Sequence, residues 1–210
     1  CIRDRYFYTK GSLYAGQTYT NIPDSDGRRI QIAWGRISHP GMPFNGMMLL
    51  PTELTLHTTK EGIRLFSNPI KETKQLFTPL KKWASLTSDK ANDHLKEFRN
   101  AGTLRIKTTF KLSHATSAGI DLFGQRILDY DMNANTINSV FYSPEDRNSM
   151  ELTADIYIDK TSIEVFIDGG IYSYSMERKA AKNNQDGICF WGNNIDIKNL
   201  EIFSVKSIWN

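Results

Sequence analysis

Residues 103–112 read Thr-Leu-Arg-Ile-Lys-Thr-Thr-Phe-Lys-Leu, and this stretch decides the fold class. The even positions from Leu104 to Leu112 carry apolar side chains and one threonine, whereas the odd positions carry polar or charged side chains. Because successive side chains of a strand point to opposite faces, this alternation predicts a strand with one buried and one wet face. The stretch is therefore typical of an antiparallel sheet.

Two later stretches repeat the alternation. Residues 152–158 place Leu, Ala, Ile and Ile at every second position, and residues 163–167 do the same with Ile, Val and Ile. The second run meets Asp168-Gly169-Gly170 and continues over residues 171–176. This predicts a hairpin, because glycine accepts the positive φ that a tight turn demands. A final strand pair is expected over residues 187–191 and 199–208.

The first third of the chain is also rich in strand patterns. The expected strands cover residues 13–20, 28–34, 53–58 and 63–66. Helix signals are confined to residues 70–77 and 88–99. The chain is therefore predicted to divide into a β-rich portion (1–68), a linker (69–100) and a second β-rich portion (101–210). With turn signals every 8 to 12 residues and no internal repeat, the sequence alone predicts an all-β sandwich, barrel or propeller.

Composition excludes several classes of protein. The 210 residues are 40% hydrophobic and 11% aromatic, unlike a disordered chain. Lys and Arg number 26 against 23 Asp and Glu, which does not indicate a nucleic-acid partner. The longest apolar run is far shorter than the roughly 20 residues that cross a bilayer, so no membrane span is expected. Nucleotide-binding and nucleophile-elbow motifs do not occur, and no cofactor is predicted.

Metal sites and catalytic carboxylates gain little support from the sequence. Residues 129–135 place Asp and Asn at alternate positions, but a calcium loop also needs Gly at its sixth position and Glu at its twelfth, where Ala134 and Val140 stand. A hairpin turn is the better interpretation, and the four His show no zinc spacing, so no metal is predicted. The candidate carboxylates are turn or strand residues without unusual context: Asp24, Asp26, Asp159, Glu164 and Asp168.

Aromatic side chains are the remaining candidates for ligand contact. Tyr14, Trp34 and Trp191 could stack on sugar rings, although a Trp at the end of a strand is more often part of the core. The residues by themselves therefore indicate an all-β protein with a hint of carbohydrate chemistry.

Several segments, in order along the chain, resemble glycoside hydrolase family 32, the family of levanases, inulinases and invertases. Residues 14–24 (Tyr-Ala-Gly-Gln-Thr-Tyr-Thr-Asn-Ile-Pro-Asp) and 27–34 (Gly-Arg-Arg-Ile-Gln-Ile-Ala-Trp) are similar to two of its strands. Residues 40–45 and 50–56 resemble the next loop and strand of the bacterial levanase-like members, and residues 61–66 with Asn68-Pro69 continue the match. Residues 158–169 are similar to the family's C-terminal hairpin, and residues 205–209 (Val-Lys-Ser-Ile-Trp) to its closing segment.

The resemblance implies a fold and an activity. The fold is the last blade of a five-bladed β-propeller followed by a C-terminal antiparallel β-sandwich. Family members are retaining hydrolases with an Asp nucleophile in a WMNDPNG motif, a Glu acid/base in an EC motif and an Asp in an RDP motif. None of these motifs occurs in this sequence, so no catalytic residue is assigned. The substrate-binding residues that the match suggests are Tyr14, Gln17 and Trp34; a second Trp found in some members is Ser38 here.

Three roles are the resulting hypotheses. The first is the C-terminal part of a fructan- or sucrose-hydrolysing glycosidase, inactive alone, whose partners are the preceding propeller and a fructose-containing saccharide. The second is a stand-alone fructan-binding sandwich, and the third a purely structural sandwich that stabilises or dimerises the enzyme. The resemblance also implies an extracellular, periplasmic or cell-surface location.

One expectation concerns how the chain holds together. Residues 101–210 are expected to fold by themselves, because their alternating strands supply a complete two-sheet core. The first 68 residues are expected to expose part of their apolar faces and to favour self-association. The apolar residues named for those faces are Leu13, Ile30, Ile32, Leu54 and Leu56.

Overall fold

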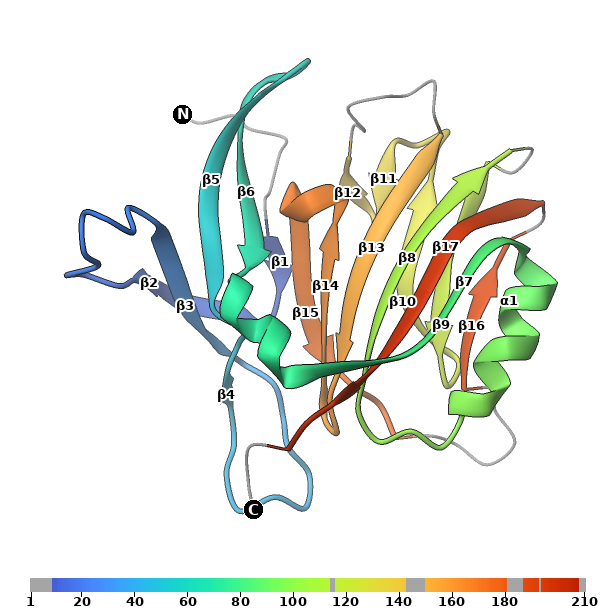
Figure 1. Cartoon of the computed structure of the whole chain (residues 1–210), viewed down its shortest axis with the longest axis horizontal. Coiled ribbons are helices and arrows are strands. Elements are labelled where there is room, and N and C mark those ends of the chain that lie inside the picture. Colours follow the sequence, from blue (N-terminus) through green and yellow to red (C-terminus); the bar gives the residue numbers. More distant parts are fainter. Residues whose placement is uncertain (1–8, 114–115, 143–149, 181–186, 193, 208–210) are drawn as a thin grey trace.

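The computed structural model describes residues 9–113, 116–142, 150–180, 187–192 and 194–207. The first eight residues of the expected blade portion, and the end of the last expected strand, lie outside these ranges. Over these ranges the chain forms three β-sheets and one α-helix, whose arrangement Figure 1 shows. Two of the sheets face each other as a sandwich, and the third packs against the outer face of the larger of these two sheets. No helix within the described ranges is long and apolar enough to cross a membrane.

The large sheet of the sandwich has seven strands in the order β1-β15-β14-β13-β8-β17-β7. All of its ladders are antiparallel except the parallel pair of β1 with β15. Its strands are β1 (Thr9–Gly11), β7 (Phe77–Thr87), β8 (Leu104–Leu112), β13 (Glu151–Ile158), β14 (Ser162–Ile167), β15 (Tyr172–Glu177) and β17 (Ile195–Val205). The sequence expectation for β8 and for the β13–β14–β15 run is confirmed.

The small sheet of the sandwich has five strands in the order β12-β11-β10-β9-β16. Its strands are β9 (Ser117–Leu122), β10 (Gln125–Asp131), β11 (Thr136–Ile137), β12 (Val140–Phe141) and β16 (Ile188–Trp191). All of its described ladders are antiparallel.

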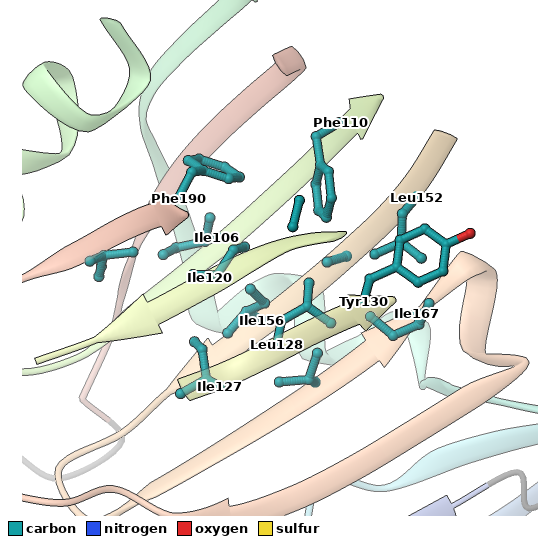
Figure 2. Close-up of a cluster of buried hydrophobic side chains, with 14 of the residues drawn as sticks. Ile106, Phe110, Ile120, Ile127, Leu128, Tyr130, Leu152, Ile156, Ile167 and Phe190 are labelled. Carbon is teal, nitrogen blue, oxygen red and sulfur yellow. The ribbon is translucent and has the colours of Figure 1, made fainter. Parts of the chain in front are cut away.

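A single core fills the space between these two sheets. Side chains from the inner face of the large sheet, such as Ile106, Phe110 and Ile156, meet Ile120 and Leu128 of the small sheet (Figure 2). All five are buried, and burial of one such side chain stabilises the fold by about 1.5–3 kcal/mol. The alternation in residues 103–112 therefore reports the inner face of β8.

The Asp168–Gly170 turn joins β14 to β15, as the sequence predicts. All three residues adopt positive φ, at 42°, 69° and 88°. Asp168 holds the turn against the sandwich, because its carboxylate accepts the Thr153 N–H at 2.7 Å and the hydroxyl of Tyr142.

The N-terminal sheet is the third sheet. Its strands run in the order β2-β3-β5-β6, and the short β4 also pairs with β3. The strands are β2 (Leu13–Thr18), β3 (Arg29–Gly35), β4 (Met47–Met48), β5 (Thr52–Thr59) and β6 (Gly62–Pro69). An antiparallel sheet of four main strands has the form of a single propeller blade, and the expected all-β class is confirmed.

Residues 77–98 are not a linker, contrary to the sequence expectation. They form β7, the helix α1 (Ser88–Leu95) and the 3₁₀ turn η2 (Lys96–Phe98), and the 3₁₀ turn η1 (Lys71–Leu76) precedes them. Strand β7 pairs with β17 at the edge of the large sheet. Helix α1 closes one end of the core with Ala91 and Leu95, both fully buried.

The side chain of Asn92 fixes α1 to the small sheet. Its amide donates to the Phe190 carbonyl at 2.9 Å, and its side-chain oxygen accepts the Phe190 N–H at 2.7 Å. The helix that the sequence predicts over residues 88–99 therefore exists, but it belongs to the sandwich. The reason for the difference is tertiary, since α1 and β7 are fixed by partners about 100 residues further along the chain.

Candidate functional site

The register of the N-terminal sheet brings the three predicted binding residues to one face. Tyr14 pairs with Trp34 and Gln17 pairs with Ile32 across the β2–β3 ladder. Cross-strand partners point to the same side of a sheet, and Ile32 and Trp34 are two residues apart on β3. An irregularity between Tyr14 and Gln17, with Ala15 at a φ of 48°, keeps both side chains on this side.

This face, carried by Tyr14, Gln17 and Trp34, is here called the aromatic face. Tyr14 is 52% exposed and Trp34 43% exposed, and Gln17 is exposed as well. The two ring centroids lie 6.3 Å apart at an angle of 61°, and the Arg36 guanidinium carbon lies 4.7 Å from the Tyr14 ring centroid. Exposed rings beside an amide and a cation can stack on a sugar ring and bind its hydroxyl groups.

The loop of residues 39–46 supports the edge of Trp34. Gly46 has a φ of 76°, and a β-carbon there would lie 2.2 Å from the indole nitrogen, so only glycine lets the loop approach this closely. At its other end the loop is tied to the sandwich, where the Nδ1 of the buried His39 lies 2.5 Å from the Thr161 hydroxyl. Trp34 is therefore held in place but remains open to solvent on its outer side.

The opposite face of the N-terminal sheet packs on the sandwich. Ala33, Ile37 and Leu49 form a small buried cluster there. Ala33 and Trp34 are adjacent in β3, so the aromatic face points away from the sandwich.

Glu164 lies where the N-terminal sheet packs on the sandwich. The sequence predicts an outward-facing residue without unusual surroundings, and the structure corrects this prediction because the residue is buried. The side chain does point to the outer face of the large sheet, but the N-terminal sheet covers it and leaves only 7% exposed. Both carboxylate oxygens lie 3.2 Å from the Leu50 nitrogen, which donates to them. Burial raises the pKa of Glu164 to about 7, although the Leu50 hydrogen bond acts in the opposite direction.

Three other candidate carboxylates have structural partners. Asp26 accepts a hydrogen bond from the Arg28 Nε at 2.6 Å, and this bond lowers the pKa of Asp26 to about 2. Asp159 accepts the N–H of the next residue at 2.7 Å, and Asp168 fixes its turn through Thr153. Of the five candidates, Glu164 lines the small cavity found in the described part of the chain.

The acidic stretch of residues 129–135 is a hairpin turn. Strand β10 ends at Asp131, whose carboxylate accepts the Ala134 N–H at 2.9 Å, and Asn135 has a φ of 52°. Over the residues with described positions, no group of three or more His, Cys, Asp or Glu side chains could hold a metal ion.

Trp191 does not join the aromatic face. It lies on the small sheet, where its indole N–H donates to the Leu128 carbonyl at 3.2 Å. The Arg126 guanidinium carbon lies 3.7 Å from the ring centroid and so covers the indole ring. Trp191 is therefore half-buried, and its hydrogen bond to Leu128 holds it on the small sheet.

Known proteins resemble the chain over most of its length. No family model matches it. The chain is 24% identical to levanase of Bacillus subtilis (strain 168) in an alignment 232 positions long that covers 94% of this chain and 33% of levanase. It is 31% identical to sucrose-6-phosphate hydrolase of Vibrio alginolyticus in an alignment 170 positions long that covers 75% of this chain and 33% of that protein. The chain thus spans about a third of the length of these curated relatives.

Among solved structures, the exo-inulinase from Aspergillus awamori shares the fold. Its TM-score is 0.69 at 15% identity, and the match covers 97% of this chain and 45% of that one. The fold and its neighbours define an all-β protein with a propeller blade and a β-sandwich. Over almost all of its length, the chain is similar to part of two levanases and resembles the C-terminal portion of glycoside hydrolase family 32 proteins.

Proposed function

We propose that this chain is the C-terminal part of a retaining glycosidase that hydrolyses β-fructofuranosyl linkages in fructans or sucrose. The observation that carries the proposal is the match to two levanases over 94% and 93% of the chain, set against only 33% and 24% of those proteins. The catalytic carboxylates would then lie in a preceding part of the protein. The extracellular, periplasmic or cell-surface location implied by the resemblance is part of the same proposal.

The N-terminal sheet supports a role in completing a propeller. One of its faces is covered by the sandwich, whereas Tyr14, Trp34 and Met48 are exposed on the other side or edge of β3. Blades of a propeller pack face to face, so an exposed apolar face is the surface that a preceding blade would cover. The sandwich would then act as a rigid support for the last blade.

Hydrolysis assays test the first part of this proposal. The 210-residue chain, purified to homogeneity, is incubated with levan, inulin and sucrose, and released fructose is measured. We expect no turnover, because a retaining mechanism needs two facing carboxyl groups about 5–5.5 Å apart. Turnover that co-purifies with the chain and disappears on mutation of one of its own carboxylates would refute the assignment.

The exposed rings of the aromatic face favour a second candidate function, a fructan-binding module. Isothermal titration with fructo-oligosaccharides up to millimolar concentration tests it. If the face binds sugar, Trp34→Ala should abolish the heat, since stacking on an aromatic ring is lost. Trp191→Ala serves as the matched control, because Trp191 is covered by Arg126 and lies on another sheet. If the parent chain gave no heat, the fructan-binding role would be rejected and the structural role would be the remaining candidate.

A further inference from the structure

A small polar cavity lies between the N-terminal sheet and the outer face of the large sheet. It offers about 20 Å³ to water, enough for one or two molecules. Its lining includes Gln31, Leu50, Thr52, Glu164, Tyr174 and Ser175. Glu164 is the one carboxylate in this lining, so the cavity joins the two parts of the chain around a single acid.

Charged groups around Glu164 do not neutralise it. On the large sheet its ladder partners are Tyr157 on β13 and Ser175 on β15. Asp159, at the turn before β14, repels the carboxylate, and Tyr174 of the lining donates its hydroxyl to the Ile127 carbonyl. The residues that the N-terminal sheet contributes to the described lining, such as Gln31 and Thr52, carry no ionisable side chain.

No cationic side chain lines the described cavity, and the ion pairs found in the described ranges do not include Glu164. The ring of the buried His39 contacts the hydroxyl of Thr161. The hydroxyl of Ser175, which is 4% exposed, has no hydrogen-bond partner in the described part of the chain. Among the lining side chains with described positions, none carries a fixed positive charge that would balance an ionised Glu164.

We propose that Glu164 is a protonation-sensitive latch that sets how firmly the N-terminal sheet is held on the sandwich. With the carboxyl group neutral, its burial costs little and the Leu50 N–H keeps an acceptor. With the group ionised, opening the junction lets the carboxylate reach water, so the open state gains relative to the closed one. This inference concerns contacts within the chain and does not depend on the proposed hydrolase function.

The direction of the effect follows from proton linkage. Burial raises the pKa of Glu164 from its usual value of 4.5 to about 7 in the closed state. Between these two values the open state has already lost its proton while the closed state still binds one, so closure weakens as the pH rises. Below this window both states are protonated, and above it both are ionised, so the dependence levels off at each end.

Hydrogen exchange at the Leu50 amide measures this opening directly, because that N–H donates to Glu164. Exchange is followed from pH 5 to pH 8 on the full chain and corrected for the intrinsic pH dependence of amide exchange. For the parent chain we expect the corrected opening constant to rise about 70-fold over this range. For Glu164→Gln, a neutral isostere, we expect it to stay constant at or below the value of the parent chain at pH 5.

The matched control is Glu177→Gln, which removes an exposed carboxylate from the neighbouring strand β15. It should keep the pH dependence of the parent chain. A constant opening constant in the parent chain, or an equal rise in Glu164→Gln, would overturn the latch. If Glu164→Gln did not fold, the parent and Glu177→Gln profiles would still decide, since both must show the rise.

Discussion

The Arg105 guanidinium binds the Asp155 carboxylate through two hydrogen bonds, from Nε at 2.9 Å and from a terminal nitrogen at 2.7 Å, across the β8–β13 ladder. Three rings surround the same guanidinium, with centroids 4.9–5.2 Å from its central carbon. They belong to Phe77 on β7, Tyr157 on β13 and Phe203 on β17. The Arg105 side chain thus contacts residues of β7, β13 and β17, and it helps to hold the edge strand β7 on the large sheet.

Removal of Asp155 should therefore destabilise the whole sandwich. Asp155→Ala leaves a largely buried guanidinium without its anion, and we expect a loss of about 2–3 kcal/mol, below the usual range for fully buried pairs because both side chains keep some exposure. Chemical denaturation of the parent and the variant measures the loss. As a control, Asp93→Ala breaks a solvent-exposed pair with Lys96 and should cost far less stability than Asp155→Ala. Equal losses for the two variants would contradict the role assigned to Arg105.

Gly170 and Ser67 make a close backbone contact that joins the sandwich to the N-terminal sheet. A β-carbon at Gly170 would lie 2.3 Å from the Ser67 carbonyl oxygen, and Gly170 has a φ of 88°. Gly170→Ala should therefore push β6 away from the turn, in addition to the cost of positive φ. We expect a loss of about 3 kcal/mol or more, mainly from backbone displacement.

Gly169 provides the matched control for that variant. It also has a positive φ, 69°, but its β-carbon would meet no atom within 4 Å. Gly169→Ala should cost only the conformational strain, about 1–2 kcal/mol. Thermal unfolding of both variants separates the cost of positive φ from the cost of the close contact with Ser67. If Gly170→Ala were as stable as Gly169→Ala, the close contact would not contribute to the loss of stability.

The sequence predicts the strands whose two faces differ in environment. Strands β8 and β13 show clear alternation because their inner side chains enter one core. Strand β7 shows none, since it is an edge strand with most side chains exposed, and only Trp83 and Leu86 pack against that core. Its position depends on pairing with β17, a partner more than 100 residues away that no local pattern indicates.

The same limit applies to the site. The strand order of β2 and β3 is local, so the sequence could place Tyr14, Gln17 and Trp34 near one another, although their role in sugar binding stays a prediction. The burial of Glu164 could not be predicted, because its phase on β14 indicates only the outer face. Whether that face is wet depends on the N-terminal sheet, which lies about 100 residues earlier in the chain.

The position of β7 and α1 changes where a self-sufficient sandwich should begin. Residues 70–210 keep β7, Leu95 and the Asn92 contacts to Phe190, whereas residues 101–210 lose all three. Loss of Leu95 and its neighbours opens one end of the core, where each buried side chain contributes about 1.5–3 kcal/mol. We expect the 70–210 fragment to unfold cooperatively and the 101–210 fragment to fail to do so, as measured by thermal circular dichroism. A cooperative 101–210 fragment would support the boundary predicted from the sequence instead.

The β5–β6 hairpin leaves an apolar surface at its tip, and this surface should govern self-association. Leu56 is 70% exposed and Ile63 67% exposed, and the β5–β6 register puts both on one face together with Leu65. Ile30, which the sequence analysis expects to be partly exposed, is buried instead. The exposed apolar surface therefore lies nearer the tip of the β5–β6 hairpin than the sequence predicts. Strand β6 also forms an edge of its sheet, which favours pairing with another copy.

A Leu56→Lys, Ile63→Lys double variant tests this surface. We expect the parent chain to show a mass that increases with concentration in sedimentation equilibrium, because exposed apolar edges attract each other. The double variant should remain monomeric over the same range, with a melting temperature within about 2 °C of the parent, since substitutions of exposed residues usually change stability by about 0.5 kcal/mol or less. Thr58→Lys, on the same hairpin but without loss of an apolar side chain, separates the effect of added charge from that of removed apolar surface. A parent chain that stays monomeric at high concentration would refute the prediction, as would a double variant that associates as strongly as the parent.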